Sequence, residues 1–168
     1  MSIEYLKFRL FQFKTNLEFA WFVLKRNREW DYSFFIQMQI KKLTVMGKYF
    51  RNYGFTIDED RRKIVRSIWK ARRHLLNFNN SSEILGKKAE LEILRQIKKP
   101  YNTELISEKK GKYYSCIIKI KDYTIEEEEK AKSIYNIIAG SEMELKYQKE
   151  ELTQAFEILR ENILQWWD

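Results

Sequence analysis

The sequence predicts a mainly α-helical protein, in which five or six helices pack as a bundle with one β-hairpin inserted at about residues 101–121. Glycine and proline, which mark turns, number only 5 and 1, too few for a β-sandwich of this length. Apolar residues also recur at spacings of three and four, as in helices with one buried face. We expect a single domain over residues 1–168, large enough to bury a core.

The first predicted helix, residues 3–28, is apolar on more than one face. Its main stripe has helical spacing and consists of Ile3, Leu6, Leu10, Phe13, Leu17, Trp21 and Leu24. Thr15 and Glu18 match a capping box, which favours a break at Thr15–Asn16. Partial alternation over Tyr5–Phe13 leaves a short strand there as the alternative.

Two helices follow. One runs from about Tyr32 to Tyr53, with Asp31 as its N-cap and Gly54 at its end. The next opens with a capping box formed by Thr56 and Glu59. Its predicted buried stripe is Ile64, Ile68, Ala71 and Leu75.

The second half of the chain changes in character. Asn77–Ser82 is predicted as a polar loop and residues 83–98 as a helix. Tyr101–Ile106 and Tyr113–Lys121 are strand-like and are joined by a polar turn over Ser107–Lys112.

The last two predicted helices are separated by a glycine. A capping box of Thr124 and Glu127 opens a helix that reaches Ala139, and Gly140 ends it. A final helix runs from Ser141 to the C-terminus.

Positive charge is concentrated in the first half of the chain. Residues 1–80 carry 17 Lys and Arg against 7 Asp and Glu, whereas residues 81–168 carry 15 against 17, for a net charge of +8. The basic half therefore directs a positive field toward an anionic partner.

The sharpest basic feature is a row of cations on one face of the third helix. Lys63, Arg66, Lys70 and Arg73 follow at i, i+3, i+7 and i+10. If the second and third helices form an antiparallel hairpin, cations from both meet in one groove, with aromatic rings to stack on a base. The predicted ligand-binding residues are Lys41, Lys48, Tyr49, Arg51, Arg62, Lys63, Arg66, Trp69, Lys70, Arg73 and His74. A solvated helix face is the alternative.

The sequence lacks the residues that several kinds of chemistry require. One cysteine, Cys116, and one histidine, His74, allow neither an internal disulfide nor a Cys/His zinc site. We see no phosphate-binding glycine loop or metalloprotease motif, so we expect no catalysis, metal or cofactor. Phe19–Leu24, the longest charge-free stretch near the N-terminus, is too short to span a membrane, and no signal peptide is recognisable.

The second apolar face of the first helix predicts a homo-oligomer. We expect the interface to contain Phe11, Trp21, Phe22 and Trp167. A monomer with the first helix at its centre is the alternative.

Three short motifs resemble small tailed-bacteriophage proteins of unknown function. They are the helix start Glu29-Trp30-Asp31-Tyr32, the Lys48-Tyr49-Phe50 stretch and the closing Trp166-Trp167-Asp168; the Arg/Lys-rich helix Arg61–Leu76 adds to the likeness. The resemblance implies a phage origin and a host-cytoplasmic setting. Accessory proteins of this kind often act stoichiometrically on host machinery or defence.

The leading hypothesis is therefore a phage accessory or counter-defence protein that binds and sequesters an anionic nucleotide-type ligand without catalysing a reaction. In it, Arg62, Arg66, Lys70 and Arg73 contact phosphates, and Trp69 and Tyr49 stack on a base. The alternatives are a basic-faced inhibitor that binds nucleic acid or an acidic host defence protein, and a virion structural or assembly protein.

Overall fold

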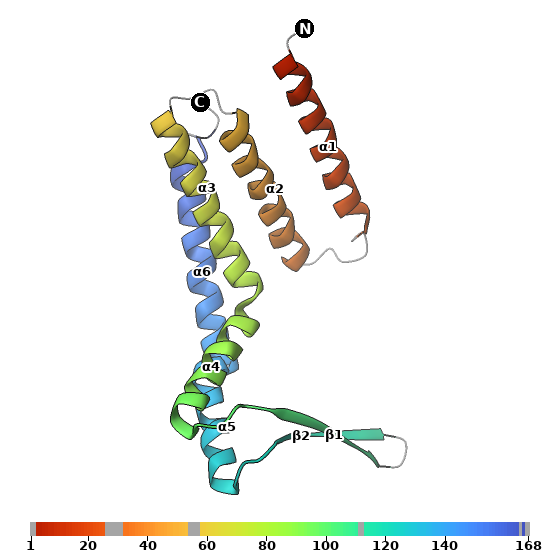
Figure 1. The fold of residues 1–168 in the computed structure, drawn as a ribbon, viewed down its shortest axis with the longest axis vertical. Coiled ribbons are helices and arrows are strands. Elements are labelled where there is room, and N and C mark those ends of the chain that lie inside the picture. Colours follow the sequence, from red (N-terminus) through yellow and green to blue (C-terminus); the bar gives the residue numbers. More distant parts are fainter. Residues whose placement is uncertain (1–2, 26–31, 54–57, 111–112, 165, 167–168) are drawn as a thin grey trace. The chain divides into compact units, whose positions relative to one another are not determined.

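The computed structural model describes residues 3–25, 32–53, 58–110, 113–164 and 166, with backbone alone at residues 4, 58, 105–110 and 113–119. The chain is mainly helical, as predicted. The described residues form six helices and two strands: α1 Ile3–Lys25, α2 Tyr32–Tyr53, α3 Asp58–Asn79, α4 Ser81–Ile97, β1 Thr103–Lys110, β2 Tyr113–Ile120, α5 Ile125–Ala139 and α6 Ser141–Asn162 (Figure 1).

The chain divides into two compact units. The first comprises Met1–Asn79 and Gln148–Asp168, and the second comprises Asn80–Tyr147. The predicted basic half, residues 1–80, ends one residue after the first of these boundaries, whereas residues 148–168, which we placed in the acidic half, belong to the first unit. The single domain over the whole chain stays a prediction.

The core of the first unit forms where α2, α3 and the end of α6 pack together with Trp166, which follows α6 in the sequence. Each helix contributes apolar side chains at helical spacing, which places them on one face. The buried residues are Ile36, Leu43, Ile68, Ala71, Leu75, Ala155, Ile158 and Trp166. Three of the four residues of the predicted third-helix stripe are in this list, and Ile64 packs against it partly buried. The Trp166 indole also donates to the hydroxyl of Ser67 over 3.0 Å.

The N-terminal helix α1 packs beside α2 through aromatic rings. Phe8 lies against Tyr49 and Tyr53, with ring centroids 5.8 and 6.2 Å apart. The predicted break at Thr15–Asn16 and the alternative strand at Tyr5–Phe13 are both wrong, because α1 is continuous from residue 3 to residue 25. Thr15 and Glu18 lie inside the helix, where backbone N–H groups already have helical partners, so a capping box has no role there. The predicted Asp31 cap, the Gly54 end and the Thr56 capping box lie outside the described residues.

The second unit is built around α4 and α5. Its buried cluster is Ile93, Ile120, Ala131 and Ile134, and the rings of Tyr101 and Tyr135 stack beside it at 5.5 Å. The Thr124–Glu127 capping box is present at the start of α5, as predicted. A bond from Ser81 to the Glu144 carboxylate, 2.9 Å long, ties α4 to the start of α6.

Strands β1 and β2 pair antiparallel, with Thr103 opposite Ile120 and Ile106 opposite Ile117. The first strand begins two residues later than the predicted Tyr101 and extends to Lys110, into the segment predicted as a turn. The predicted Asn77–Ser82 loop is wrong. The α3 helix runs to Asn79 and α4 begins at Ser81, because Asn80 alone makes the junction and its carbonyl accepts the Ile84 N–H. The final helix ends at Asn162.

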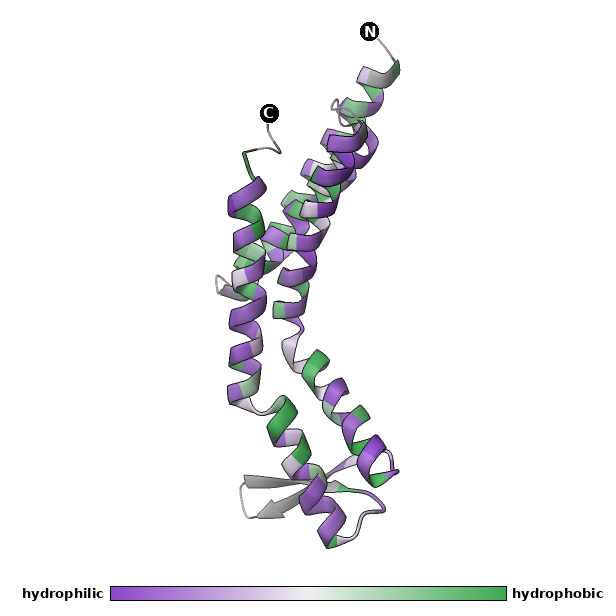
Figure 2. Cartoon of the chain, turned by 90° about the vertical axis from the view of Figure 1, so that its left-hand side faces the viewer, coloured by the Kyte–Doolittle hydropathy of each residue, from purple (hydrophilic) through white to green (hydrophobic). Residues whose placement is uncertain are grey.

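Figure 2 shows hydrophilic and hydrophobic residues intermixed along the helices. Among the described helices, none combines the length and the apolar character that a membrane-spanning segment requires.

Candidate functional site

The candidate site lies in the first unit, where α2 and α3 pack side by side. Gly47, buried in the middle of α2, has no side chain, so the Trp69 indole of α3 approaches the α2 backbone closely. One turn further along, the Arg72 guanidinium lies 5.0 Å from the Trp69 ring centre and donates to the Thr44 hydroxyl over 2.6 Å. These contacts fix how α3 faces α2 and hold the indole in place.

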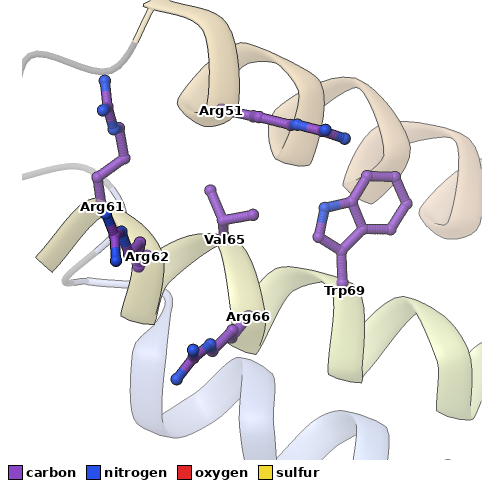
Figure 3. Close-up of a pocket in the computed structure, with 6 residues that line it drawn as sticks. All are labelled: Arg51, Arg61, Arg62, Val65, Arg66 and Trp69. Atoms are coloured by element: carbon purple, nitrogen blue, oxygen red, sulfur yellow. The ribbon is translucent and has the colours of Figure 1, made fainter. Parts of the chain in front are cut away.

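Beside Trp69 is an open hollow of about 420 Å³. Its lining residues are Arg51, Arg61, Arg62, Val65, Arg66 and Trp69. Figure 3 shows that Val65 and Trp69 point from α3 toward α2, and that Arg51 extends from α2 above them. Arg66 points away from α2, so it contributes to the rim and not to the floor. The site is therefore an apolar floor bordered by four guanidinium groups.

Most of the positive charge at this hollow is not neutralised locally. Among the described side chains, no carboxylate lies within ion-pair distance of Arg51, Arg62 or Arg66, and all three are exposed. The first unit as a whole carries 19 Lys and Arg against 12 Asp and Glu, a net charge of +7. Guanidinium groups in this state suit an incoming phosphate or carboxylate, which they can bind through two parallel hydrogen bonds.

Two of the predicted ligand-binding cations are partnered within the chain. Lys41 forms an ion pair with Glu18 of α1 at 3.3 Å. Lys63 lies 3.5 Å from Glu59 and 3.7 Å from Asp60, in the first turn of α3. The acidic residues of the first turn therefore neutralise Lys63, although its helical spacing predicted that it would act together with Arg66.

Other predicted ligand-binding residues lie away from the hollow. The ring of Tyr49 contacts Phe8, Phe50 and Tyr53 at centroid distances of 5.4 to 6.3 Å, so it belongs to an aromatic cluster between α1 and α2. The remaining cations are exposed but do not line the hollow: Lys48, Lys70 and Arg73.

His74 faces α6 and not the basic surface. Its Nδ1 lies 2.6 Å from a carboxylate oxygen of Glu151, and Asn77 donates to the other oxygen over 3.2 Å. The His74 and Glu151 side chains are only 15% and 14% exposed, and Nε2 of His74 is buried without a partner among the described residues. This cluster joins α3 to α6, and His74 is not presented to a ligand in the hollow.

Sequence reasoning missed Arg61, Val65 and Arg72. Arg61, Val65 and Trp69 follow at four-residue spacing, which places them on the α2-facing side of α3. That spacing could have been used to predict Arg61 and Val65 as neighbours of Trp69. The Arg72–Thr44 bond joins residues 28 positions apart, and no local sequence pattern predicts it.

The predicted interface residues separate into two groups. Phe11 contacts Tyr53 at 5.2 Å and Phe22 stacks on Phe34 at 6.1 Å, so both pack within the chain. Trp21 is 68% exposed. Trp167 lies outside the described residues.

Comparison with known proteins found no family model, no curated protein and no solved structure that matches this chain. Within the described residues, no three His, Cys, Asp or Glu side chains are grouped closely enough to hold a metal ion.

Proposed function

We propose that the protein binds a phosphate-bearing ligand of the nucleotide type at the arginine hollow and sequesters it without chemical change. The observation that carries this proposal is the position of Arg51, Arg62 and Arg66, which have no carboxylate partner among the described side chains, around an apolar floor that includes Trp69. Phosphates would contact Arg51, Arg62 and Arg66, and the base would rest on the floor. A volume of about 420 Å³ is within the range of small-molecule sites.

The roles proposed here differ from those that the sequence suggested. Arg51 joins the proposed phosphate-binding residues, whereas Tyr49 leaves the base-stacking role because its ring is engaged by neighbours. Lys70 and Arg73 extend the positive surface beyond the hollow but do not line it.

The biological setting of this proposal depends on the resemblance to small phage proteins described above. Sequestration of a nucleotide-type signal would be a stoichiometric, counter-defence activity in the host cytoplasm. A nucleotide with several phosphates would engage more than one guanidinium at once, which favours retention over turnover.

The test compares two double variants with equal loss of charge. Arg51→Ala with Arg66→Ala removes two arginines of the hollow, whereas Lys70→Ala with Arg73→Ala removes two exposed cations outside it. The probe is a fluorescent nucleoside triphosphate, titrated by anisotropy. A charged hydrogen bond contributes about 1.5–3 kcal/mol, so each arginine lost should weaken binding by roughly tenfold or more.

The proposal is supported if the hollow variant loses binding and the outer variant keeps it. Unchanged binding in the hollow variant would refute the site. Native mass spectrometry of the protein purified at low salt gives an independent readout, because a retained ligand adds a discrete mass of a few hundred daltons (the order of one nucleotide).

Nucleic-acid binding is the second candidate, and one observation favours it. Arg66, Lys70 and Arg73 are all exposed on one face of α3, so the positive surface continues past the hollow. Binding to many phosphates weakens linearly with salt on a log–log scale. A single-stranded oligonucleotide with a steep salt slope, and equal losses in both double variants, would select this candidate.

A further inference from the structure

The helix α1 presents an exposed apolar stripe along its whole length. Seven large apolar side chains on it are 47% to 74% exposed: Ile3, Leu6, Leu10, Phe13, Leu17, Trp21 and Leu24. Single exposed apolar residues are ordinary on protein surfaces, but a continuous row of this size marks an interaction surface.

The opposite side of α1 is already occupied, which fixes the direction of the stripe. Phe8, Phe11 and Phe22 pack on aromatic rings of α2, and Glu18 pairs with Lys41 of α2. The helix therefore cannot turn its stripe toward α2 without breaking these contacts. This geometry corrects the predicted interface, since Phe11 and Phe22 hold α1 to its own chain.

The stripe has the spacing of a coiled-coil seam. Ile3, Leu10, Leu17 and Leu24 recur every seven residues, and Leu6, Phe13 and Ala20 each follow three residues after one of them. These are the a and d positions of a heptad repeat that is sustained over three heptads. The residues that pack on α2 occupy b and f positions, on the far side of the helix.

The exposed area of the stripe matches that of a stable dimer. From the exposed fractions, the seven side chains together offer on the order of 800 Å², about what each partner contributes to a standard interface. This exceeds the largest apolar patch of a typical monomer, roughly 300–600 Å².

The flanking charges favour one orientation of a pair of α1 helices. In a parallel pair of α1 helices, Arg9 would face Lys14 of the other copy twice, because g and e positions meet across the seam. In an antiparallel pair, e positions face e positions. Lys7 then lies beside Trp21 of the other copy, where a cation–π contact is favourable, and Lys14 meets Lys14 only once.

We infer that α1 pairs with α1 of a second copy of this chain as an antiparallel coiled coil. In the register that the charges select, Leu10 packs against Ala20, Phe13 against Leu17 and Leu6 against Leu24, each occurring twice by symmetry. In this register Phe13 meets Leu17 and not a second phenylalanine, and Ala20 meets the larger Leu10. The inference does not depend on the arginine hollow or its ligand.

The first test is the mass of the full chain in solution by light scattering. We expect twice 20.7 kDa at tens of micromolar. Leu10→Glu with Leu17→Glu should give the 20.7 kDa monomer with unchanged helicity, because both side chains are exposed within one chain. The matched control, Leu91→Glu with Leu145→Glu, alters two exposed leucines of the second unit and should remain a dimer.

The second test fixes the orientation by disulfide crosslinking in a Cys116→Ser background. A mixture of Leu10→Cys and Ala20→Cys chains should form a mixed disulfide dimer, whereas Leu10→Cys alone should not crosslink. Efficient crosslinking of Leu10→Cys alone would overturn the antiparallel register. A monomeric wild-type chain, or a dimer that survives Leu10→Glu with Leu17→Glu, would overturn the α1 pairing itself.

Discussion

Trp69 of α3 lies so close to Gly47 of α2 that a Cβ atom on residue 47 would be 3.0 Å from Cε2 of the indole. The same indole forms the floor of the arginine hollow. The distance between two helices and the shape of the candidate site therefore depend on one missing side chain.

The first prediction concerns Gly47→Ala. Alanine favours a helix over glycine by about 1 kcal/mol, but overpacking a tight contact costs about 1–3 kcal/mol. Because the indole is held by Arg72, which is itself bonded to Thr44, we expect overpacking to prevail, with a net loss of about 1 kcal/mol and weaker nucleotide binding. Chemical denaturation and probe titration measure the two effects.

The control for this substitution is Gly86→Ala in α4. There the nearest atom to an added Cβ is the hydroxyl oxygen of Tyr135 at 3.4 Å, which can move. We expect this variant to be neutral or slightly stabilised. If Gly47→Ala were stabilised as much as Gly86→Ala, the packing account of Trp69 would be wrong.

The second prediction is that His74 and Glu151 are energetically coupled. Their contact is 2.6 Å long and both side chains are mostly buried, so removing either leaves a buried polar group unsatisfied. We expect Glu151→Ala to cost about 1–3 kcal/mol. In a double-mutant cycle with His74→Ala, the coupling energy should be at least about 0.5 kcal/mol.

An exposed pair on the same helix gives the control for that cycle. Gln154 donates to Glu157 over 3.3 Å at an exposed position. The coupling energy of this pair should be near zero. Equal coupling in the two cycles would show that the buried contact between α3 and α6 has no special role.

The third prediction is a pH dependence in the second unit. The Lys99 ammonium, 2.6 Å away, lowers the pKa of the Glu127 carboxyl, and the Thr124 N–H adds to this. A lowered pKa in the folded state means that the stabilisation is complete above the ordinary value of 4.5 and is lost as pH falls through the folded value. Glu127→Gln should therefore lower the melting temperature at pH 7 and have progressively less effect below pH 4.5.

Circular dichroism melts of the full chain between pH 7 and pH 3 measure this difference. Glu126→Gln is the control, since Glu126 forms no ion pair with any described residue. A Glu127→Gln difference that stayed constant across this range would contradict the assignment to Lys99.

The fourth prediction compares two residues two positions apart in α4. Ile93 is fully buried in the core of the second unit, whereas Leu91 is 67% exposed. Ile93→Ala should cost about 2–5 kcal/mol through lost burial and the cavity left behind. Leu91→Ala should change the unfolding free energy by less than about 0.5 kcal/mol in urea denaturation, and equal costs would contradict the described core.

Helical periodicity was sufficient to predict the helices and much of the first core, because Ile68, Ala71 and Leu75 repeat on one face of α3. It could not decide which of two apolar faces of α1 packs inside the chain. Phe22 and Trp21 are adjacent and equally apolar, but only Phe22 meets a ring of α2. The deciding contact comes from Phe34, twelve residues away, and no local pattern encodes it.

The sequence likewise predicted only part of the candidate site. The basic character of α3 followed from the sequence, and Arg51, Arg62, Arg66 and Trp69 do line one hollow. The pairing of Lys41 with Glu18 and of His74 with Glu151 joins positions that are distant in sequence. Sequence spacing is informative within one helix, whereas partners across helices depend on how the helices pack.

The origin of the first core from two separated stretches has a consequence for the order of synthesis. Ile68 and Leu75 are made early, but Ala155, Ile158 and Trp166, which share their core, emerge only after the whole second unit has been translated. The growing chain thus carries an unfinished α2–α3 pair with an open apolar face while residues 80–147 are added. The second unit can form its own local contacts during this interval. The first unit is therefore completed last, although its synthesis begins first.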